Sequence, residues 1–239
     1  MAFASVERLK TAAEKNPLVV KEAKEKGKKI VGLYCLYSPA EIALAAGAAP
    51  MVLCGTRNDP IATAEETLPR NLCPLIKSSY GFAVQGTCPY FSASDIIVAD
   101  TTCDGKKKMF EYMSEIKPLH LPYLPHGPHL PEARVFWAAE MRRLVERLEK
   151  EFGVTIGEDD LAKAIALANR ERTALKGLMD LSRQKPAPLS GMNMLELLFK
   201  SGFFVDKEEI IGMLEEIVAE VSAAPQNGAS EGPRVLLTG

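Results

Sequence analysis

The chain has 239 residues, of which 47% are hydrophobic and 25% charged, an ordinary composition for a globular protein that buries a core. Its formal net charge is -2, so overall charge gives no reason to expect nucleic acid or an anionic membrane as a partner. With no apolar run of membrane-spanning length, no secretory signal and an odd number of cysteines, the sequence predicts a cytoplasmic protein with reduced thiols.

The N-terminal stretch, residues 1–27, consists mostly of helix formers and predicts a helical lead-in. Within it, Pro17 follows Asn16 and favours the start of a second helix at that point.

Residues 28–129 alternate between strand and helix patterns. Strands are expected at residues 30–34, 50–53, 95–99 and 119–121. Helices are expected between them at residues 38–47, 72–84 and 104–116. The first of these helices would begin with Ser38 as its N-cap and Glu41 as a capping-box residue. Strands that alternate with helices predict a Rossmann-like α/β domain with a parallel sheet.

Residues 130–224 change to a helical pattern with no evident chemistry, so their leucines and methionines are interpreted as core. Four helices are expected, at residues 130–152, 159–184, 188–200 and 206–222. A polar linker at residues 225–233 follows, and then a strand pattern at residues 234–239. Because a single strand cannot pair its own backbone, this pattern predicts the beginning of a second α/β domain that is missing here.

Three of the five cysteines, Cys35, Cys54 and Cys103, come after predicted strands. The carboxyl ends of parallel strands meet at one edge of a sheet, so topology should bring these thiols together. Cys73 and Cys88 flank one predicted helix and can be presented to the same edge. The start of a helix also favours a thiolate, the form of cysteine that binds metals.

Three other interpretations of the thiols stay open. Each cysteine can be a packed core residue, and Cys54, at the end of an apolar strand, is the best candidate for that. Structural zinc is disfavoured because the spacings of 19, 19, 15 and 15 residues lack close pairs. A nucleophilic cysteine would need a base, and the three histidines all lie in one proline-rich loop, at positions 120, 126 and 129.

Two charged features have both a functional and a structural interpretation. Glu41 is a candidate acid or base near the sheet edge, although a capping-box role already accounts for a glutamate at this position. The lysine run at residues 106–108 opens a predicted helix, where positive charge is unfavourable. These lysines either face a negatively charged group or an acidic partner, or form a solvated surface.

Four motifs carry a resemblance to a known family: YCLYSPAEIALAAGA, LCPLIKSSYG, GTCPYF and TTCDGKKKM. They resemble the iron–sulfur component of the 2-hydroxyacyl-CoA dehydratase family, and most closely its double-cubane-cluster reductase branch. The resemblance covers most of residues 28–125 and implies two Rossmann-like halves whose cysteines hold a cluster between them. It implies Cys73 and Cys103 as ligands of a [4Fe–4S] cluster. In a double-cubane [8Fe–9S] cluster, Cys35 and Cys88 are the candidate ligands of the second cubane, and Cys54 has no assigned role.

The same resemblance implies low-potential one-electron chemistry, either 2-hydroxyacyl-CoA dehydration or reduction of a small molecule. Electrons would come from a separate ATP-dependent iron–sulfur activator, because adding an electron to a thiolate-rich cluster is unfavourable. The expected partners also include a second copy or a paralogous subunit and an acyl-CoA or other small-molecule substrate. The alternative is a cysteine-bearing α/β binding module, or an inactive truncated remnant, with packed or zinc-bound thiols.

Overall fold

The computed structural model of the chain describes residues 3–35, 37–224, 233 and 235–236. These residues form two compact units. The α/β unit comprises Pro17–Ala166, and the helical unit comprises Met1–Asn16 together with Leu167–Gly239. Most of the expected linker and of the following strand lies outside the described residues.

The α/β unit contains a four-stranded, fully parallel sheet with the order β2-β1-β3-β4. Its strands are β1 (Ile30–Tyr34), β2 (Ala49–Leu53), β3 (Ile96–Val98) and β4 (Leu119–His120). The chain passes outward from β1 to β2 and then returns to the other side of β1 for β3. The predicted parallel α/β sheet is confirmed, and its strand order reverses beside β1.

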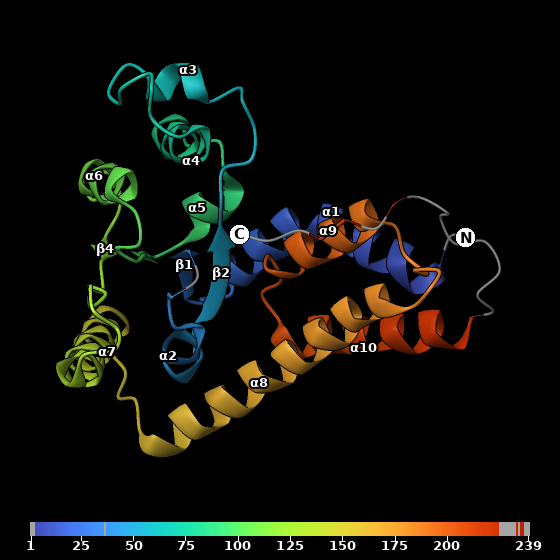
Figure 1. Ribbon diagram of the computed structural model, residues 1–239. Helices are drawn as coiled ribbons and strands as arrows, with labels where there is room; N and C mark the ends of the chain where they lie inside the picture. The colour runs from blue at the N-terminus through green and yellow to red at the C-terminus, as the bar shows by residue number, and fades with distance from the viewer. Residues whose placement is uncertain (1–2, 36, 225–232, 234, 237–239) are drawn as a thin grey trace. The chain divides into compact units, whose positions relative to one another are not determined.

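Helices cover both faces of this sheet because successive strand residues point to opposite sides. On one face Val31, Leu33 and Val98 pack against α2 (Ala40–Ala45) and α7 (Pro131–Phe152). On the other face the strands pack against four helices (Figure 1). These are α3 (Ile61–Ala64), α4 (Pro74–Gln85), α5 (Pro89–Ala93) and α6 (Asp104–Met113).

Two details of the N-terminal half correct the sequence expectations. Helix α1 runs without interruption from Ala4 to Glu25 with Pro17 inside it, so the predicted second start at this proline is wrong. Leu9 and Val20 are both buried, and burial on either side of the proline outweighs the loss of one backbone hydrogen bond. The short helices α3 and α5 were not expected from the sequence pattern.

The N-cap assigned to Ser38 is also wrong. Pro39 occupies the N-cap of α2, with no side-chain capping bond. The Ser38 hydroxyl instead donates to the carbonyl oxygens of Tyr34, at 2.8 Å, and Val98, at 3.3 Å. The Val98 acceptor becomes available only when β1 and β3 are neighbours in the sheet, so local sequence does not reveal it.

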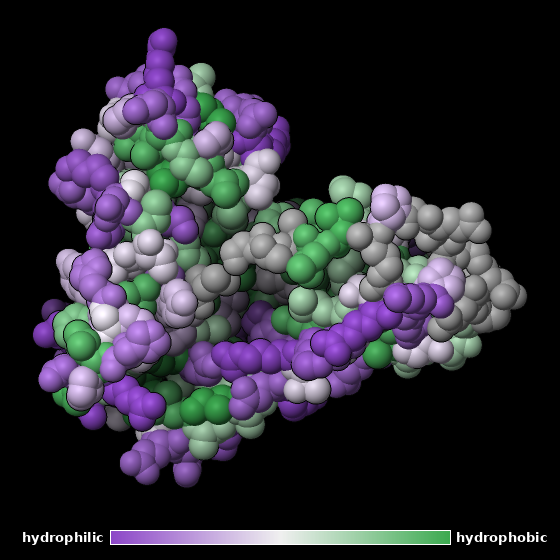
Figure 2. All heavy atoms as spheres, viewed as in Figure 1, coloured by the Kyte–Doolittle hydropathy of each residue, from purple (hydrophilic) through white to green (hydrophobic). Residues whose placement is uncertain are grey.

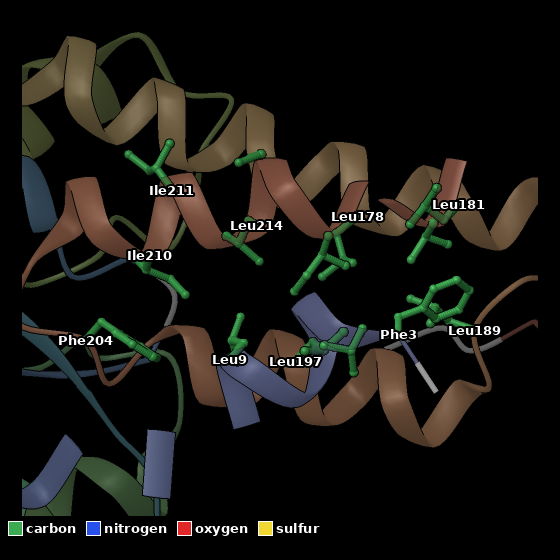
Figure 3. Packing of buried hydrophobic residues seen from close by; sticks show 14 residues of the cluster. Phe3, Leu9, Leu178, Leu181, Leu189, Leu197, Phe204, Ile210, Ile211 and Leu214 are labelled. Atoms are coloured by element: carbon green, nitrogen blue, oxygen red, sulfur yellow. The ribbon is translucent and has the colours of Figure 1, made fainter. Parts of the chain in front are cut away.

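The helical unit packs the start of α1 with three long helices and a 3-10 turn around one apolar core. Its elements are α8 (Glu158–Asp180), η1 (Leu181–Arg183), α9 (Gly191–Ser201) and α10 (Lys207–Ala223). Figure 3 shows Leu9, Leu178 and Leu214 directed into this core. Hydrophilic side chains cover the outer side of α8 (Figure 2). The expected helices are present, although α8 gives way to η1 at Leu181.

Within the described part of the chain, no helix combines the length and apolar character that crossing a membrane requires.

Candidate functional site

The carboxyl edge of the parallel sheet collects three thiols. Cys35 directly follows β1, Cys54 directly follows β2, and Cys103 follows β3 after a short turn. Since β2, β1 and β3 are neighbours and run in the same direction, these residues leave the sheet at one edge. The edge on which topology was expected to gather the thiols is therefore present, and β2 runs toward the side where α3 and α4 lie (Figure 1).

Three cysteines occupy the N-cap positions of helices. Cys73 precedes α4, Cys88 precedes α5 and Cys103 precedes α6. The Cys88 sulfur accepts a hydrogen bond from the backbone N–H of Phe91 at 3.4 Å, whereas Cys73 and Cys103 make no side-chain capping bond. The first turns of α4 and α6 therefore present backbone N–H groups beside a thiol whose sulfur makes no capping bond.

Helices α4 and α6 approach each other closely near Cys73 and Cys103. Two side-chain ends from the start of α4 lie close over Gly105, the second residue of α6. A Cβ atom there would lie 2.8 Å from Cδ1 of Leu72 and 2.9 Å from Cδ1 of Ile76. Because Leu72 precedes Cys73 and Gly105 lies two residues after Cys103, the starts of α4 and α6 are near each other.

Cys35 is held in an unusual way. Its backbone has φ of 73°, and it is the non-glycine residue with positive φ in the part of the chain that the structure describes. Its sulfur accepts a hydrogen bond from Nζ of Lys106 at 2.6 Å, across 71 positions of sequence. A strained backbone that persists at a sheet edge is characteristic of functional sites.

Burial dominates the ionisation of the half-buried thiols. It raises the pKa of Cys35, and the partial burial of the otherwise exposed Cys54 raises the pKa of that thiol too, while the nearby Lys106 ammonium acts in the opposite direction on both. Burial likewise raises the pKa of Cys88, with the backbone N–H groups of Phe91 and Tyr90 opposing it. Neutral thiols are therefore favoured unless a cation or a metal compensates for the lost hydration.

A phenol and a lysine lie among the thiols. Burial, and next the charges of Cys88, Cys54 and Cys35, raise the pKa of the Tyr34 hydroxyl far above its ordinary value. Burial lowers the pKa of Lys106, but the hydrogen bond and charge of Cys35 and the nearby Asp100 and Cys103 outweigh this effect and raise it. Four of the five thiols, those of Cys35, Cys54, Cys88 and Cys103, are thus electrostatic neighbours of Tyr34 or Lys106. Cys73 lies at the start of α4.

Residues 35–239 match the family described as 2-hydroxyglutaryl-CoA dehydratase, D-component. The chain belongs to this family.

Individual relatives agree with the family match. The Escherichia coli (strain K12) protein named "Putative dehydratase subunit YjiM" is 47% identical over 224 residues, which are 93% of this chain and 58% of the relative. Lactoyl-CoA dehydratase subunit beta of Anaerotignum propionicum is 26% identical, over 90% of this chain and 56% of the relative. The beta subunit of (R)-2-hydroxyglutaryl-CoA dehydratase of Acidaminococcus fermentans is 24% identical, over 99% of this chain and 62% of the relative. The dehydratase-family chain thus spans less than two thirds of the length of these relatives.

The donors at this edge of the dehydratase-family chain are thiols, the ligand type by which proteins hold iron–sulfur clusters. Among the described residues, no three or more histidine, cysteine, aspartate or glutamate side chains lie close enough to hold one metal ion. Cys35, Cys88 and Cys103 are half-buried beside one apolar cluster of side chains, which limits access of water. Cys54 and Cys73 are exposed.

Some residues that shape the site were not predicted from sequence. Asp100 is fully buried, and its carboxylate accepts hydrogen bonds from the backbone N–H of Tyr37, at 3.1 Å, and from the Thr102 hydroxyl, at 2.6 Å. It therefore joins the loop after β1 to the loop after β3. The aspartate two positions before a threonine is a turn signal that sequence reasoning could have used. Glu41 lies half-buried in the first turn of α2, and its role as an acid or base stays a prediction.

Proposed function

We propose that this chain is the iron–sulfur subunit of a 2-hydroxyacyl-CoA dehydratase-type system. The observation that carries the proposal is the set of thiols around Lys106 and Tyr34, together with Cys73 at the neighbouring helix start. Packing in a core does not account for a cysteine beside a lysine ammonium, a cysteine with a strained backbone, or cysteines at the starts of helices. The family membership supports the dehydratase assignment.

The ligand assignment is the one that the family resemblance implies, and the positions of the thiols support it. Cys73 and Cys103 stand at the starts of two adjacent helices and are proposed as ligands of a [4Fe–4S] cluster. Cys35 and Cys88 contact the same apolar cluster from other elements and are proposed as ligands of a second cubane in an [8Fe–9S] cluster. Cys54 is left outside the ligand set.

When bound, the cluster supplies one-electron reduction at low potential. The residues of this chain then have three tasks. The cysteines bind iron as thiolates, the first-turn N–H groups of α4 and α6 stabilise that negative charge, and the apolar side chains beside them exclude water. The electron donor is proposed to be an ATP-dependent iron–sulfur activator, because external energy is required to add an electron to an already anionic cluster.

Substrate and subunit partner are proposed by similarity. Three relatives are named as dehydratase beta subunits acting on lactoyl-CoA, (R)-phenyllactyl-CoA and (R)-2-hydroxyglutaryl-CoA. We therefore expect a 2-hydroxyacyl-CoA thioester as substrate and a second subunit, either another copy or a paralogue. Reduction of a different small molecule remains the alternative for a double-cubane protein, and turnover of a 2-hydroxyacyl-CoA with activator and ATP distinguishes the two.

The test is anaerobic purification followed by reconstitution with ferrous iron and sulfide. We expect a brown protein with about four irons and four sulfides per chain for a cubane, or about eight irons and nine sulfides for a double cubane. Cys103→Ser should lose most of the iron, whereas Cys54→Ser should keep it. A colourless protein that holds zinc or no metal would overturn the proposal and favour an inactive binding module. Equal iron loss in both variants would overturn the ligand assignment.

A further inference from the structure

The structure separates the three consecutive lysines of α6. Nζ of Lys107 pairs with Asp104 at 2.8 Å, and Nζ of Lys108 pairs with Glu111 at 2.7 Å, each on the surface of the same helix. Nζ of Lys106 instead leaves its helix and contacts the Cys35 sulfur at the end of β1. The three lysines form one run in the sequence, but among the described contacts only Lys106 reaches a thiol.

The position of Lys106 is unfavourable by the rules of helix stability. It lies in the first turn of α6, where the dipole repels a cation, and it is half-buried. Its neighbours counter this cost, since the Cys35, Cys54 and Cys103 thiols and the Asp100 carboxylate are all close enough to interact with its charge.

Cys35, the hydrogen-bond partner of Lys106, carries an independent sign of function in its positive φ. Two local preferences are thus violated at one contact. Lys106 places a cation in the first turn of a helix, and Cys35 adopts a positive φ without being glycine. Such coincidences mark sites at which function is maintained against local preference.

We propose that Lys106 is a positioning residue that acts through Cys35: its ammonium donates to the Cys35 thiolate in the loaded protein and favours the form of the cluster that holds one extra electron. The inference rests on the proposed function. In this step one electron enters the cluster from a one-electron reductant, and no bond or proton changes place. A fixed positive charge beside a thiolate ligand stabilises the more negative product, which raises the reduction potential.

The experiment is a redox titration of the reconstituted full chain with titanium(III) citrate, followed by electron paramagnetic resonance. Iron and sulfide are counted first, so that a failure to hold a cluster in the wild type rejects the proposed function itself. In Lys106→Gln we expect unchanged iron and an equilibrium constant for reduction that falls about tenfold, which corresponds to about 59 mV for one electron. Lys107→Gln and Lys108→Gln remove the same charge one and two positions away and should leave the equilibrium unchanged.

Two results would overturn the inference. One is a Lys106→Gln protein whose reduction equilibrium equals that of the wild type. The other is an equal shift in all three glutamine variants, which would indicate general surface charge instead of the contact with Cys35. If the Lys106→Gln protein does not assemble a cluster, the same redox titration is made on Lys106→Arg, which keeps the positive charge. A cluster with the wild-type equilibrium supports the role of the charge, and no cluster or a tenfold shift contradicts it.

Discussion

The two units begin their helices in different ways. In the helical unit α9 and α10 start with Ser190 and Asp206, whose side-chain oxygens accept hydrogen bonds from first-turn N–H groups at 3.2 Å and 2.9 Å. In the α/β unit α4 and α6 start with Cys73 and Cys103, which make no such bond. Oxygen caps stabilise a helix by about 1 kcal/mol, a contribution that thiols at these positions do not provide.

This difference shows where the chain follows local stability rules and where it departs from them. The helical unit combines oxygen caps, a continuous apolar core and no cysteine. The α/β unit contains all five cysteines and a strained residue at a strand end. A cation in a first helical turn occurs in both units, as Lys106 of α6 and Lys207 of α10, but only Lys106 contacts a thiol among the described residues. Departures from local rules that gather at one sheet edge indicate a functional site.

The largest expected effect contrasts two glycines inside helices. A Cβ at Gly81 in α4 would lie 2.0 Å from the carbonyl oxygen of Pro60, whereas a Cβ at Gly177 in α8 would meet only Val218 at 3.5 Å. Gly81→Ala should lower the free energy of unfolding by about 3 kcal/mol, because rigid backbone must move. Gly177→Ala should raise it by about 0.5 to 1 kcal/mol through helix propensity. Denaturant unfolding followed by circular dichroism measures both, and changes of the same sign would contradict this reading of the packing.

A smaller effect tests the helix caps of the helical unit. Ser190→Ala removes the oxygen that accepts from the N–H of Asn193 and should lower the free energy of unfolding by about 1 kcal/mol. Ser190→Thr keeps an oxygen and serves as the control, with a loss well below that of alanine. Thermal unfolding of the purified proteins measures the difference, and equal stability of Ser190→Ala and the wild type would contradict the assigned cap.

The reciprocal change tests the cap of α4. Cys73→Ser places an oxygen at a helix start and should stabilise the metal-free protein by about 0.5 kcal/mol. The same substitution should reduce the iron bound after reconstitution, because serine replaces a proposed thiolate ligand. A gain in stability together with a loss of iron is the signature of a position kept for function. Lower stability in the metal-free protein would show that the thiol itself stabilises the fold.

The smallest effect is a pH dependence confined to the α/β unit, which contains all three histidines. Burial, and then Arg147 and Arg143, lower the pKa of His120, while Glu140 opposes them. Nε2 of His120 is buried without a hydrogen-bond partner in the described part of the chain. The unfolded chain therefore binds a proton more readily than the folded one, so stability should fall as pH drops below about 6.5. In His120→Gln this part of the decline should disappear from unfolding curves measured between pH 7.5 and 5.5, and an unchanged decline would contradict it.

Much of the fold follows from local pattern. The strand expected at residues 30–34 is β1, and the helix expected at residues 130–152 is α7 within one residue. These segments are long enough, or apolar enough, for their periodicity to identify them. The continuous α1 and the two-acceptor role of Ser38 were not predictable, because each depends on burial or on neighbours that only the folded chain provides.

In the candidate site, too, some features follow from the sequence pattern and others depend on tertiary packing. Parallel topology places Cys35, Cys54 and Cys103 at one edge, and the sequence predicted that edge. Which lysine of residues 106–108 reaches a thiol depends on the rotation of α6 about its axis, and that is set by tertiary packing of Met109 and Phe110. The burial of Asp100 likewise arises from the two loops that it joins.

The central claim is that the thiols of the α/β unit hold an iron–sulfur cluster. The most direct test is anomalous diffraction at the iron edge from crystals of the full chain grown and frozen under anaerobic conditions. The account predicts anomalous density from several irons within bonding distance of the Cys73 and Cys103 sulfurs. Crystals of the reconstituted brown protein with iron bound elsewhere, or with no iron at these sulfurs, would contradict it.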